Sequence, residues 1–401
     1  MRQKFYLNGN FRKEATGIKR RNVSGNLNRR QNMSLTSILS DRDNQELRDK
    51  LKTEFLRPAF ILKTEIKAPP LTNNWGIVGT AFDYLMRFYL QHHNKNTFIQ
   101  RDTWVADHSY KTLTNQFSTS KQTEVRTGFH RDKVFKTKDL LKIITDQYDQ
   151  TKTNYSKFIA NGQLTDDLIS NTIYLAKLDA YFRAGFIDQN FDNHNPDDIK
   201  DLHSIISLVD KTNFTAKHHC YFNPTFGEGS MLVGGADADL IIDNTLIDIK
   251  ATKHLKLDRE HLNQVLGYYI LSLIGGVNNN PNDRPIENIG LYFARHGELW
   301  TLPLHQFGDQ RKFEEFKDWF ISYVSRGRMT FDDLKDLMLS LKSKPEKPAK
   351  PEVKKKVVTK KLATKTKPKT TTKKETVAKP TTKKTSVTKP KTTAKKTTKK
   401  K

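Results

Sequence analysis

The sequence predicts a mixed α/β protein whose folded body lies between two basic arms. Apolar residues recur at helical spacing through the first half of the body. Beyond residue 217, short strand-like runs are separated by turn residues, with one helical pattern among them. The net charge of this 401-residue chain, +26, is concentrated at its two ends. We therefore expect a basic flexible arm at 1–33, a mainly helical part at 34–210, an α/β core at 211–341 and a tail at 342–401.

The two arms differ sharply from the body in composition. Residues 342–401 carry 24 lysines, three glutamates and no Phe, Tyr, Trp or Gly, and residues 1–33 carry nine Lys or Arg and one Glu. The body, 34–341, is left with a net charge of −3. Segments without apolar side chains cannot offset the loss of chain entropy, so we expect the tail to be disordered. Its lysines predict sequence-independent affinity for the phosphates of nucleic acid.

Composition also excludes several classes of protein. The only cysteine, Cys220, rules out a disulfide framework and a multi-cysteine zinc module, and it fits a reducing compartment. The first residues lack the apolar region of a secretory signal, and the longest apolar stretch, near 268–277, is half a membrane span. We expect an intracellular protein without a membrane partner, cytoplasmic and either nucleoid-associated in a bacterium or nuclear in a eukaryote.

The first half of the body predicts mostly helices. Ser40 or Asp41 would cap the first helix, and Pro196 precedes the last, as an early helical turn allows. An alternating run before Pro69-Pro70 predicts a strand. The expected elements are helices at 40–56, 76–91, 138–160, 165–186 and 197–209, and a strand at 59–66.

The second half predicts an α/β core, because strands and helices alternate there. One helix is closed by Gly275-Gly276, Thr330 would cap the last helix, and GEGS at 227–230 is typical of a turn. The expected strands lie within HHCYFNPTFG, SMLVGGADADLIID and TLIDIKAT, at 288–295, and in a short run after it; the expected helices lie at 258–273, near 312–324 and after Thr330.

The segment GGADADLIIDNTLIDIK carries the main chemical signal. If Asp243-Asn244 is a two-residue hairpin turn, Ile242 pairs with Thr245. Counting back along the two strands then places Asp239 directly opposite Asp248. Because side chains alternate along a strand, both carboxylates share one face of the sheet.

The same count places Asp237 opposite Lys250 on that face. Directly opposed like charges are unfavourable, so Asp239 and Asp248 need a cation between them. Carboxylate oxygens favour Mg²⁺ or Mn²⁺ over zinc. A lysine beside the cation can orient a water or neutralise charge on a phosphate. The carboxylates, the cation and the lysine together match the needs of metal-assisted phosphodiester hydrolysis.

The following helix adds a polar pair. Gln264 and Tyr268 are four residues apart and share one helical face, while the apolar residues of this helix mostly occupy the other. An amide and a phenol hydroxyl here can hold a nucleotide phosphate or support the lysine and its water. The alternative is an ordinary polar helix edge.

Taken in order, these motifs resemble those of the PD-(D/E)xK nuclease superfamily, in its RecB- and Cas4-like branch. The matching residues are Gly234-Gly235-Ala236-Asp237 with Asp239, Asp248-Ile249-Lys250 and Gln264-x-x-x-Tyr268. The strand IGLYFARHG fits the family's fourth core strand. The resemblance covers roughly 221–304 and implies a restriction-endonuclease-like, four-stranded mixed sheet with flanking helices and a helical N-terminal portion packed on it.

Two departures from the family pattern leave alternatives open. The family usually has one aspartate before the hairpin: Asp237 fits the Gly-x-x-Asp spacing, whereas Asp239 fits the apolar run that follows and lies opposite Asp248. We favour Asp239. The family often supplies a His or Glu ligand from an upstream helix, where this chain has Asp83, which is equally well explained as the partner of Arg87.

The resemblance implies a Mg²⁺-dependent deoxyribonuclease, with Mn²⁺ able to substitute. A non-catalytic DNA-binding or packaging protein on a nuclease scaffold, or a nuclease acting on RNA, are the alternatives. The chain has no helicase or ATP-binding motif, so any unwinding would come from a DNA-processing partner. The expected site comprises Asp239 and Asp248 as metal ligands, Asp237 or Asp83 as a further ligand, Lys250 for the water and the transition state, and Gln264 and Tyr268 for the strand.

Overall fold

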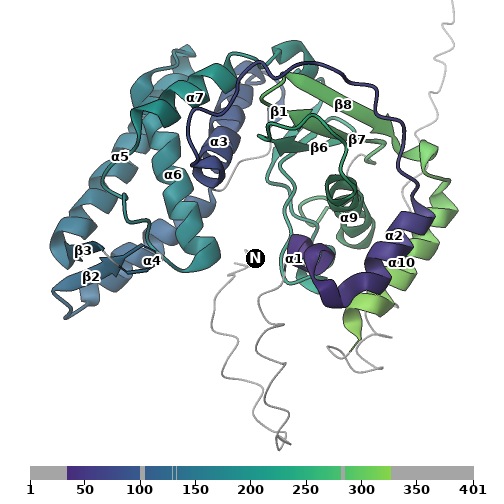
Figure 1. Ribbon diagram of the computed structural model, residues 1–401, viewed down its shortest axis with the longest axis horizontal. Coiled ribbons are helices and arrows are strands. Elements are labelled where there is room, and N and C mark those ends of the chain that lie inside the picture. Colours follow the sequence, from purple (N-terminus) through teal and green to yellow (C-terminus); the bar gives the residue numbers. More distant parts are fainter. Residues whose placement is uncertain (1–33, 100–103, 129, 132, 281–284, 327–401) are drawn as a thin grey trace, which may run out of the picture. The chain divides into compact units, whose positions relative to one another are not determined.

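A computed structural model describes residues 34–326 apart from 100–103, 129, 132 and 281–284 (Figure 1). Both basic arms and the helix expected after Thr330 lie outside the described residues. No helix in the described part of the chain is long and apolar enough to cross a membrane.

A six-stranded mixed sheet organises the described residues. Strand β4 pairs antiparallel with β5, β5 antiparallel with β6, β6 parallel with β7 and β7 antiparallel with β8, while β1 pairs parallel with β4. The predicted α/β class is therefore confirmed, with two more strands than the four expected. The strands in sheet order are β1 (Phe98–Ile99), β4 (His219–Phe222), β5 (Leu240–Ile242), β6 (Thr245–Lys250), β7 (Asn288–Phe293) and β8 (Glu298–Pro303).

One face of the sheet packs against α9 (Arg259–Gly275), which forms the crossover between the parallel strands β6 and β7 (Figure 1). Parallel neighbours need such a crossover. Phe55, directly after α2 (Gln45–Glu54), stacks on Phe313 of α10 (Gln310–Ser325) with ring centroids 5.2 Å apart. These helices and α1 (Leu35–Ser40) enclose the first apolar core.

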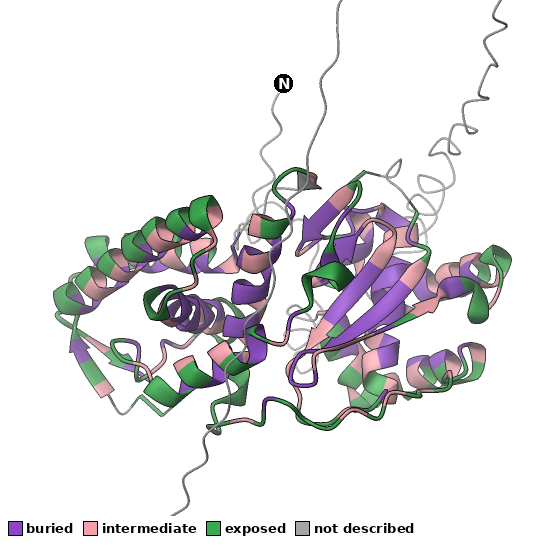
Figure 2. Cartoon of the chain, turned by 90° about the horizontal axis from the view of Figure 1, so that it is seen from above, coloured by how far each residue is buried: buried purple, intermediate pink, exposed green. Residues whose placement is uncertain are grey.

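The opposite face packs against α3 (Trp75–His93), α6 (Asp166–Ala184) and α7 (Pro196–Ile206). Figure 2 shows the strands largely buried between these layers. A third apolar core lies among α3, α4 (Val105–Thr119), α5 (Thr137–Asn161) and α6, beside a hairpin of β2 (Glu124–Thr127) and β3 (Lys133–Lys136).

The helices expected at 76–91, 138–160, 165–186 and 197–209 are confirmed as α3, α5, α6 and α7. Their starts follow the expected chemistry. Thr165 caps α6 by accepting a hydrogen bond from the Leu168 N–H, and Pro196 occupies the first turn of α7. Helix α4 and the β2–β3 hairpin were not predicted.

The strand expected at 59–66 is wrong. Its alternation is real: Phe60 packs against Phe293 and Trp300 of the sheet, while Ile61 is 80% exposed. Its backbone, however, joins no ladder in the described residues. Side-chain periodicity reports which side faces the core, and does not report whether a neighbouring strand is available for pairing.

Two boundaries also differ from expectation. The helix expected at 40–56 begins earlier, as α1, and is interrupted by a 3₁₀ turn at Arg42–Asn44 before α2. Asp41 caps that turn rather than a single long helix. Residues 227–230, expected as a turn, lead into the short helix α8 (Glu228–Leu232).

Candidate functional site

The β5–β6 hairpin has the register expected from the sequence. Ile242 pairs with Thr245 across the two-residue turn, where Asp243 adopts a positive φ of 52°. The paired ladder ends at Leu240 and Ile247, so Asp239 and Asp248 are the next residues on the two strands. The Asp239 carboxylate continues the connection by accepting a hydrogen bond of 2.6 Å from the Ile249 N–H.

The two carboxylates lie on the face of the sheet that α9 covers. Ile241 and Leu246, two residues from each aspartate along their strands, belong to the core formed with α9. Leu240 and Ile247 belong to the core on the opposite face. The alternation of side chains therefore directs Asp239 and Asp248 towards α9.

Helix α9 supplies the remaining polar groups of the site. The Lys250 Nζ atom lies 2.6 Å from Asp248 Oδ2 and donates a hydrogen bond of 2.8 Å to Gln264 Oε1. Gln264 Nε2 in turn donates to the Tyr268 hydroxyl oxygen at 3.0 Å, and it lies 3.5 Å from Thr36 Oγ1. The lysine, glutamine and tyrosine motifs are thus joined in one continuous hydrogen-bonded chain.

Burial controls the electrostatics of this site. Burial and the negative charges of Asp248 and Asp83 raise the pKa of Asp239 well above its usual range, against the Ile249 hydrogen bond and the Lys250 charge. Burial and the carboxylates of Asp248 and Asp239 also raise the pKa of Tyr268. The hairpin therefore holds a concentration of negative charge that is only partly neutralised by Lys250.

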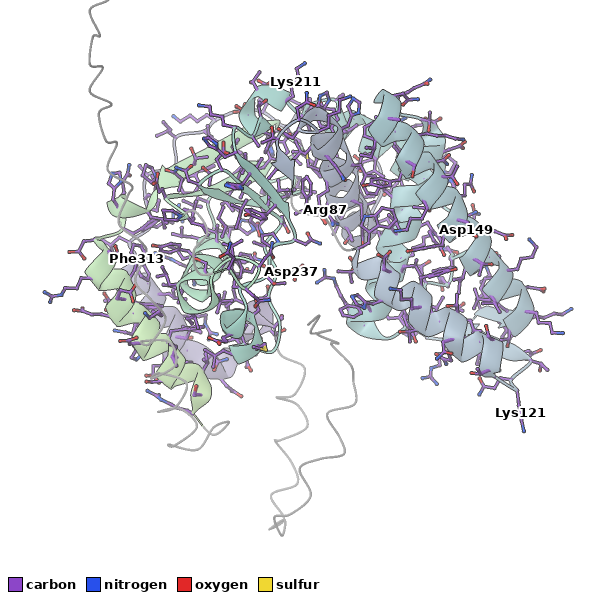
Figure 3. All side chains as sticks on the ribbon, turned by 180° about the vertical axis from the view of Figure 1, so that it is seen from behind. Arg87, Lys121, Asp149, Lys211, Asp237 and Phe313 are labelled. Atoms are coloured by element: carbon purple, nitrogen blue, oxygen red, sulfur yellow. The ribbon has the colours of Figure 1, made fainter. Side chains whose placement is uncertain are left out.

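Asp237 does not extend the hairpin to Lys250 as expected. It forms an isolated antiparallel bridge with Thr225 instead. Burial raises its pKa, and the positive charges that oppose this rise are Arg183 of α6 and, more weakly, Arg87 of α3, which Figure 3 labels together with Asp237. The β5–β6 ladder ends at Leu240, whereas on the other edge of the strand the register with β4 continues to the Thr225–Asp237 bridge.

Asp83 is the ion-pair partner of Arg87, which is one of the two roles considered for it in the sequence. Its carboxylate pairs with the buried Arg87 guanidinium at 2.7 Å. Its charge also contributes to the raised pKa of Asp239, so helix α3 brings a third carboxylate near the hairpin.

Several charged residues near the site were not singled out from the sequence. Arg183 donates from Nε to the buried Asp179 at 2.6 Å, although its side chain remains 59% exposed. Tyr84 donates to Asp179 at 3.3 Å. On α9, burial and the Lys250 charge lower the pKa of His261. Pairs four residues apart, such as Asp179 and Arg183, read as ordinary surface helix pairs, and no sequence signal separates them from that class.

The oxygen ligands of this site meet part of what a metal ion needs. Among the described residues, no group of three or more His, Cys, Asp or Glu side chains is arranged to hold a metal. Asp239 and Asp248 provide two carboxylates on one face. Mg²⁺ usually retains several waters and is held by one or two carboxylates together with substrate phosphates. The residues present therefore fit a hydrated Mg²⁺ and do not form a closed protein cage.

Comparisons with protein-family models, with curated proteins and with solved structures find no match for this chain.

Proposed function

We propose that this chain is a Mg²⁺-dependent deoxyribonuclease that hydrolyses phosphodiester bonds. The observation that carries the proposal is the connected set of polar groups on the α9 side of the sheet. Asp248 contacts Lys250, Lys250 donates to Gln264, and Gln264 donates to Tyr268. Asp239 lies opposite Asp248 with a raised pKa. A buried cluster of like charges favours a cation, and a lysine beside it favours a phosphate substrate.

The resemblance of the motifs to PD-(D/E)xK nucleases is supported by the order of elements. An antiparallel hairpin carries Asp239, Asp248 and Lys250, the helix after it carries Gln264 and Tyr268, and a parallel strand follows. This order is the one expected for a restriction-endonuclease-like core.

In the mechanism we propose, Asp239 and Asp248 hold the metal. When held there, Mg²⁺ would supply polarisation of a phosphoryl oxygen and a more acidic water. Lys250, fixed by Asp248 on one side and Gln264 on the other, orients the attacking water and stabilises negative charge on the phosphate. A new P–O bond forms to the water oxygen, the bond to the leaving nucleotide breaks, and a proton passes to the leaving oxygen.

Residues around this centre are suited to holding the DNA strand. Gln264 and Tyr268 present an amide and a hydroxyl beside Lys250. Arg183, anchored through Nε to Asp179, keeps much of its guanidinium exposed near Asp237. A guanidinium held in one orientation is a good phosphate ligand because its donors form a rigid fork.

A non-catalytic DNA-binding protein is the alternative from another class. In such a scaffold Asp239 would only be unfavourable, because burying this carboxyl beside Asp248 and Asp83 opposes its ionisation. The buried cluster therefore favours catalysis. A nuclease that cleaves RNA remains the second alternative, because the same chemistry applies to both backbones.

The test uses the full-length protein with fluorescent single- and double-stranded DNA and RNA, in Mg²⁺ and in a chelator. We expect Mg²⁺-dependent cleavage of DNA. Lys250→Met should reduce the rate roughly 100-fold or more, because it removes charge stabilisation from the transition state. Lys256→Met, which alters an exposed lysine beyond the hairpin, is the matched control and should remain active.

The other outcomes separate the alternatives. Cleavage of RNA alone would favour the ribonuclease. Binding of DNA without cleavage in Mg²⁺ would favour the packaging protein and would contradict the proposal.

A further inference from the structure

An open pocket of about 270 Å³ lies at the start of α3. Trp75, the first residue of this helix, is 60% exposed there, and Leu71 is half exposed. In contrast, Trp104 and Trp300 are buried. An indole left in water inside a pocket is available for stacking. The residues that line the pocket are Pro70, Leu71, Thr72, Asn73, Trp75 and Lys253.

The two walls of this pocket are tied together by the buried Arg295. Its guanidinium donates to the Ala68 carbonyl oxygen at 3.0 Å on one side and to the Ala251 carbonyl oxygen at 3.0 Å on the other. Asp201 of α7 neutralises it with bonds of 2.7 and 2.9 Å. The loop before Trp75 and the segment that carries Lys253 are therefore held side by side by one buried cation.

The loop itself is also fixed to α7. The Thr72 hydroxyl donates to Asp198 at 2.6 Å, and the Asn74 amide donates to the same carboxylate at 2.9 Å. Asp198 is buried. The pocket is thus part of a preorganised surface, which lowers the entropic cost of binding a ligand.

The pocket is built on two chain segments that also carry residues of the candidate active site, α3 and the segment formed by β6 and the residues directly after it. Lys253 follows Lys250 by three residues. Helix α3 lies close to the same segment, since a Cβ added at Gly79 would be 3.9 Å from the Ala251 Cβ. Along α3, Trp75 and Asp83 are eight residues apart, which corresponds to about 12 Å of helix.

We propose that this pocket receives one unpaired base of the DNA strand held at the active site. The base stacks on the Trp75 indole, and a backbone phosphate lies beside the Lys253 ammonium. The inference rests on the proposed nuclease function and narrows its substrate to DNA with a single-stranded segment. Bases within a duplex are already stacked and paired, and they would have to be extruded to reach an indole.

Binding of full-length Asp248→Asn to an oligothymidylate and to a blunt duplex, without Mg²⁺, tests this inference. Trp75→Ala should weaken single-strand binding by roughly 5- to 150-fold, the range for loss of one stacked base, and leave duplex binding unchanged. Trp75→Phe should retain most of the affinity. Ile61→Ala, at an apolar residue outside the pocket that is even more exposed than Trp75, is the control.

Two further readouts report direct contact rather than structural damage. The oligothymidylate should quench tryptophan fluorescence in the parent protein and should quench it less in Trp75→Phe. The slope of log affinity against log salt should be unchanged in Trp75→Ala, because stacking involves no phosphate, and should become shallower by about 1 in Lys253→Met.

Equal losses on single strand and duplex, or no loss with Trp75→Ala, would overturn the inference. These outcomes are independent of catalysis, because binding is measured in a variant without activity. If the wild-type protein cleaves DNA but Trp75→Ala changes neither single-strand binding nor fluorescence quenching, only the proposal of a base-binding pocket is contradicted. If the oligothymidylate quenches Trp75 fluorescence but the wild-type protein does not cleave DNA, only the nuclease assignment is contradicted.

Discussion

The environment of Asp239 has opposite effects on folding stability and on the proposed metal binding. Burial and two neighbouring carboxylates raise its pKa, so they oppose its ionisation in the metal-free protein. A Mg²⁺ ion needs the ionised form. The arrangement therefore disfavours the folded state without metal at neutral pH and favours cation binding there.

The raised pKa of Asp239 predicts an unusual dependence of folding stability on pH. In the unfolded chain Asp239 loses its proton near its ordinary value of 3.8, while in the fold it keeps the proton to higher pH. The stability contributed by this group is therefore present below the ordinary value and is lost as pH rises towards the folded pKa. Asp239→Asn should raise the free energy of unfolding at neutral pH without Mg²⁺, and the gain should disappear near pH 4. Denaturant titrations across pH measure this.

Asp243 in the same hairpin provides a control of opposite sign. Burial raises its pKa, but hydrogen bonds from the Lys217, His219 and His218 N–H groups outweigh burial and lower it. Asp243→Asn should therefore destabilise the protein at neutral pH, and the loss should shrink as pH falls through the folded pKa. Parallel pH profiles for the two variants would contradict the assignment of the Asp239 environment.

The buried pair of Arg295 and Asp201 gives a second prediction at this scale. Removing one partner leaves the other charge buried without compensation. Asp201→Ala should lower the free energy of unfolding by about 3–5 kcal/mol, as measured by denaturant titration. Asp197→Ala, on the same helix and in a more exposed pair with Lys200, should cost no more than about 1 kcal/mol. Similar losses in the two variants would show that the buried pair is not coupled as described.

At the scale of elements, the hairpin shows where sequence reasoning succeeds. The two-residue turn at Asp243-Asn244 has a clear chemical signature, and counting from it predicts the observed register, in which Asp239 and Asp248 directly follow the last pair, Leu240–Ile247. Counting further, to Asp237 and Lys250, failed because the β5–β6 ladder ends at that pair, although the other edge of the strand stays paired as far as the Thr225–Asp237 bridge. The hairpin sequence carries no signal for where the ladder ends.

The helices and the extended segment at 59–66 show the same limit. Long amphipathic helices with caps were predictable because their signals are local. The segment at 59–66 alternates like a strand and packs on the sheet without pairing, which only the tertiary structure decides. Likewise, the contacts of Arg183, Arg87 and Asp83 near the hairpin depend on how α3 and α6 pack against it.

The hairpin geometry predicts different effects for its two upstream aspartates. Asp239→Ala should abolish detectable cleavage and move the Mg²⁺ requirement beyond practical concentrations, because it removes a charged oxygen ligand. Asp237→Ala should leave a slower enzyme that higher Mg²⁺ partly rescues, because this carboxylate interacts chiefly with the Arg183 charge and its backbone bridges to Thr225 rather than to Lys250. Cleavage rates against Mg²⁺ concentration measure both. The reverse ranking would indicate that the Gly-x-x-Asp spacing identifies the true ligand.

At the scale of the whole molecule, charge is divided between a nearly neutral body and two basic arms. Deleting 343–401, which lies outside the described residues, should leave the melting temperature of the body unchanged because that segment has few apolar side chains to bury. The deletion should weaken DNA binding and flatten the dependence of log affinity on log salt, since fewer counterions are released. An unchanged slope would mean that this segment does not contact phosphate.

The most direct test of the account is cleavage of DNA by Asp248→Asn. Asp248 is buried against Lys250 and lies opposite Asp239, so the substitution removes a ligand charge at the centre of the proposed site while preserving its size. Asp149→Asn, at an exposed position on α5, is the matched control. With Mg²⁺ present, we expect the control to cleave DNA like the wild-type protein and Asp248→Asn to bind DNA without cleaving it. Full activity in Asp248→Asn would contradict the assignment of this site.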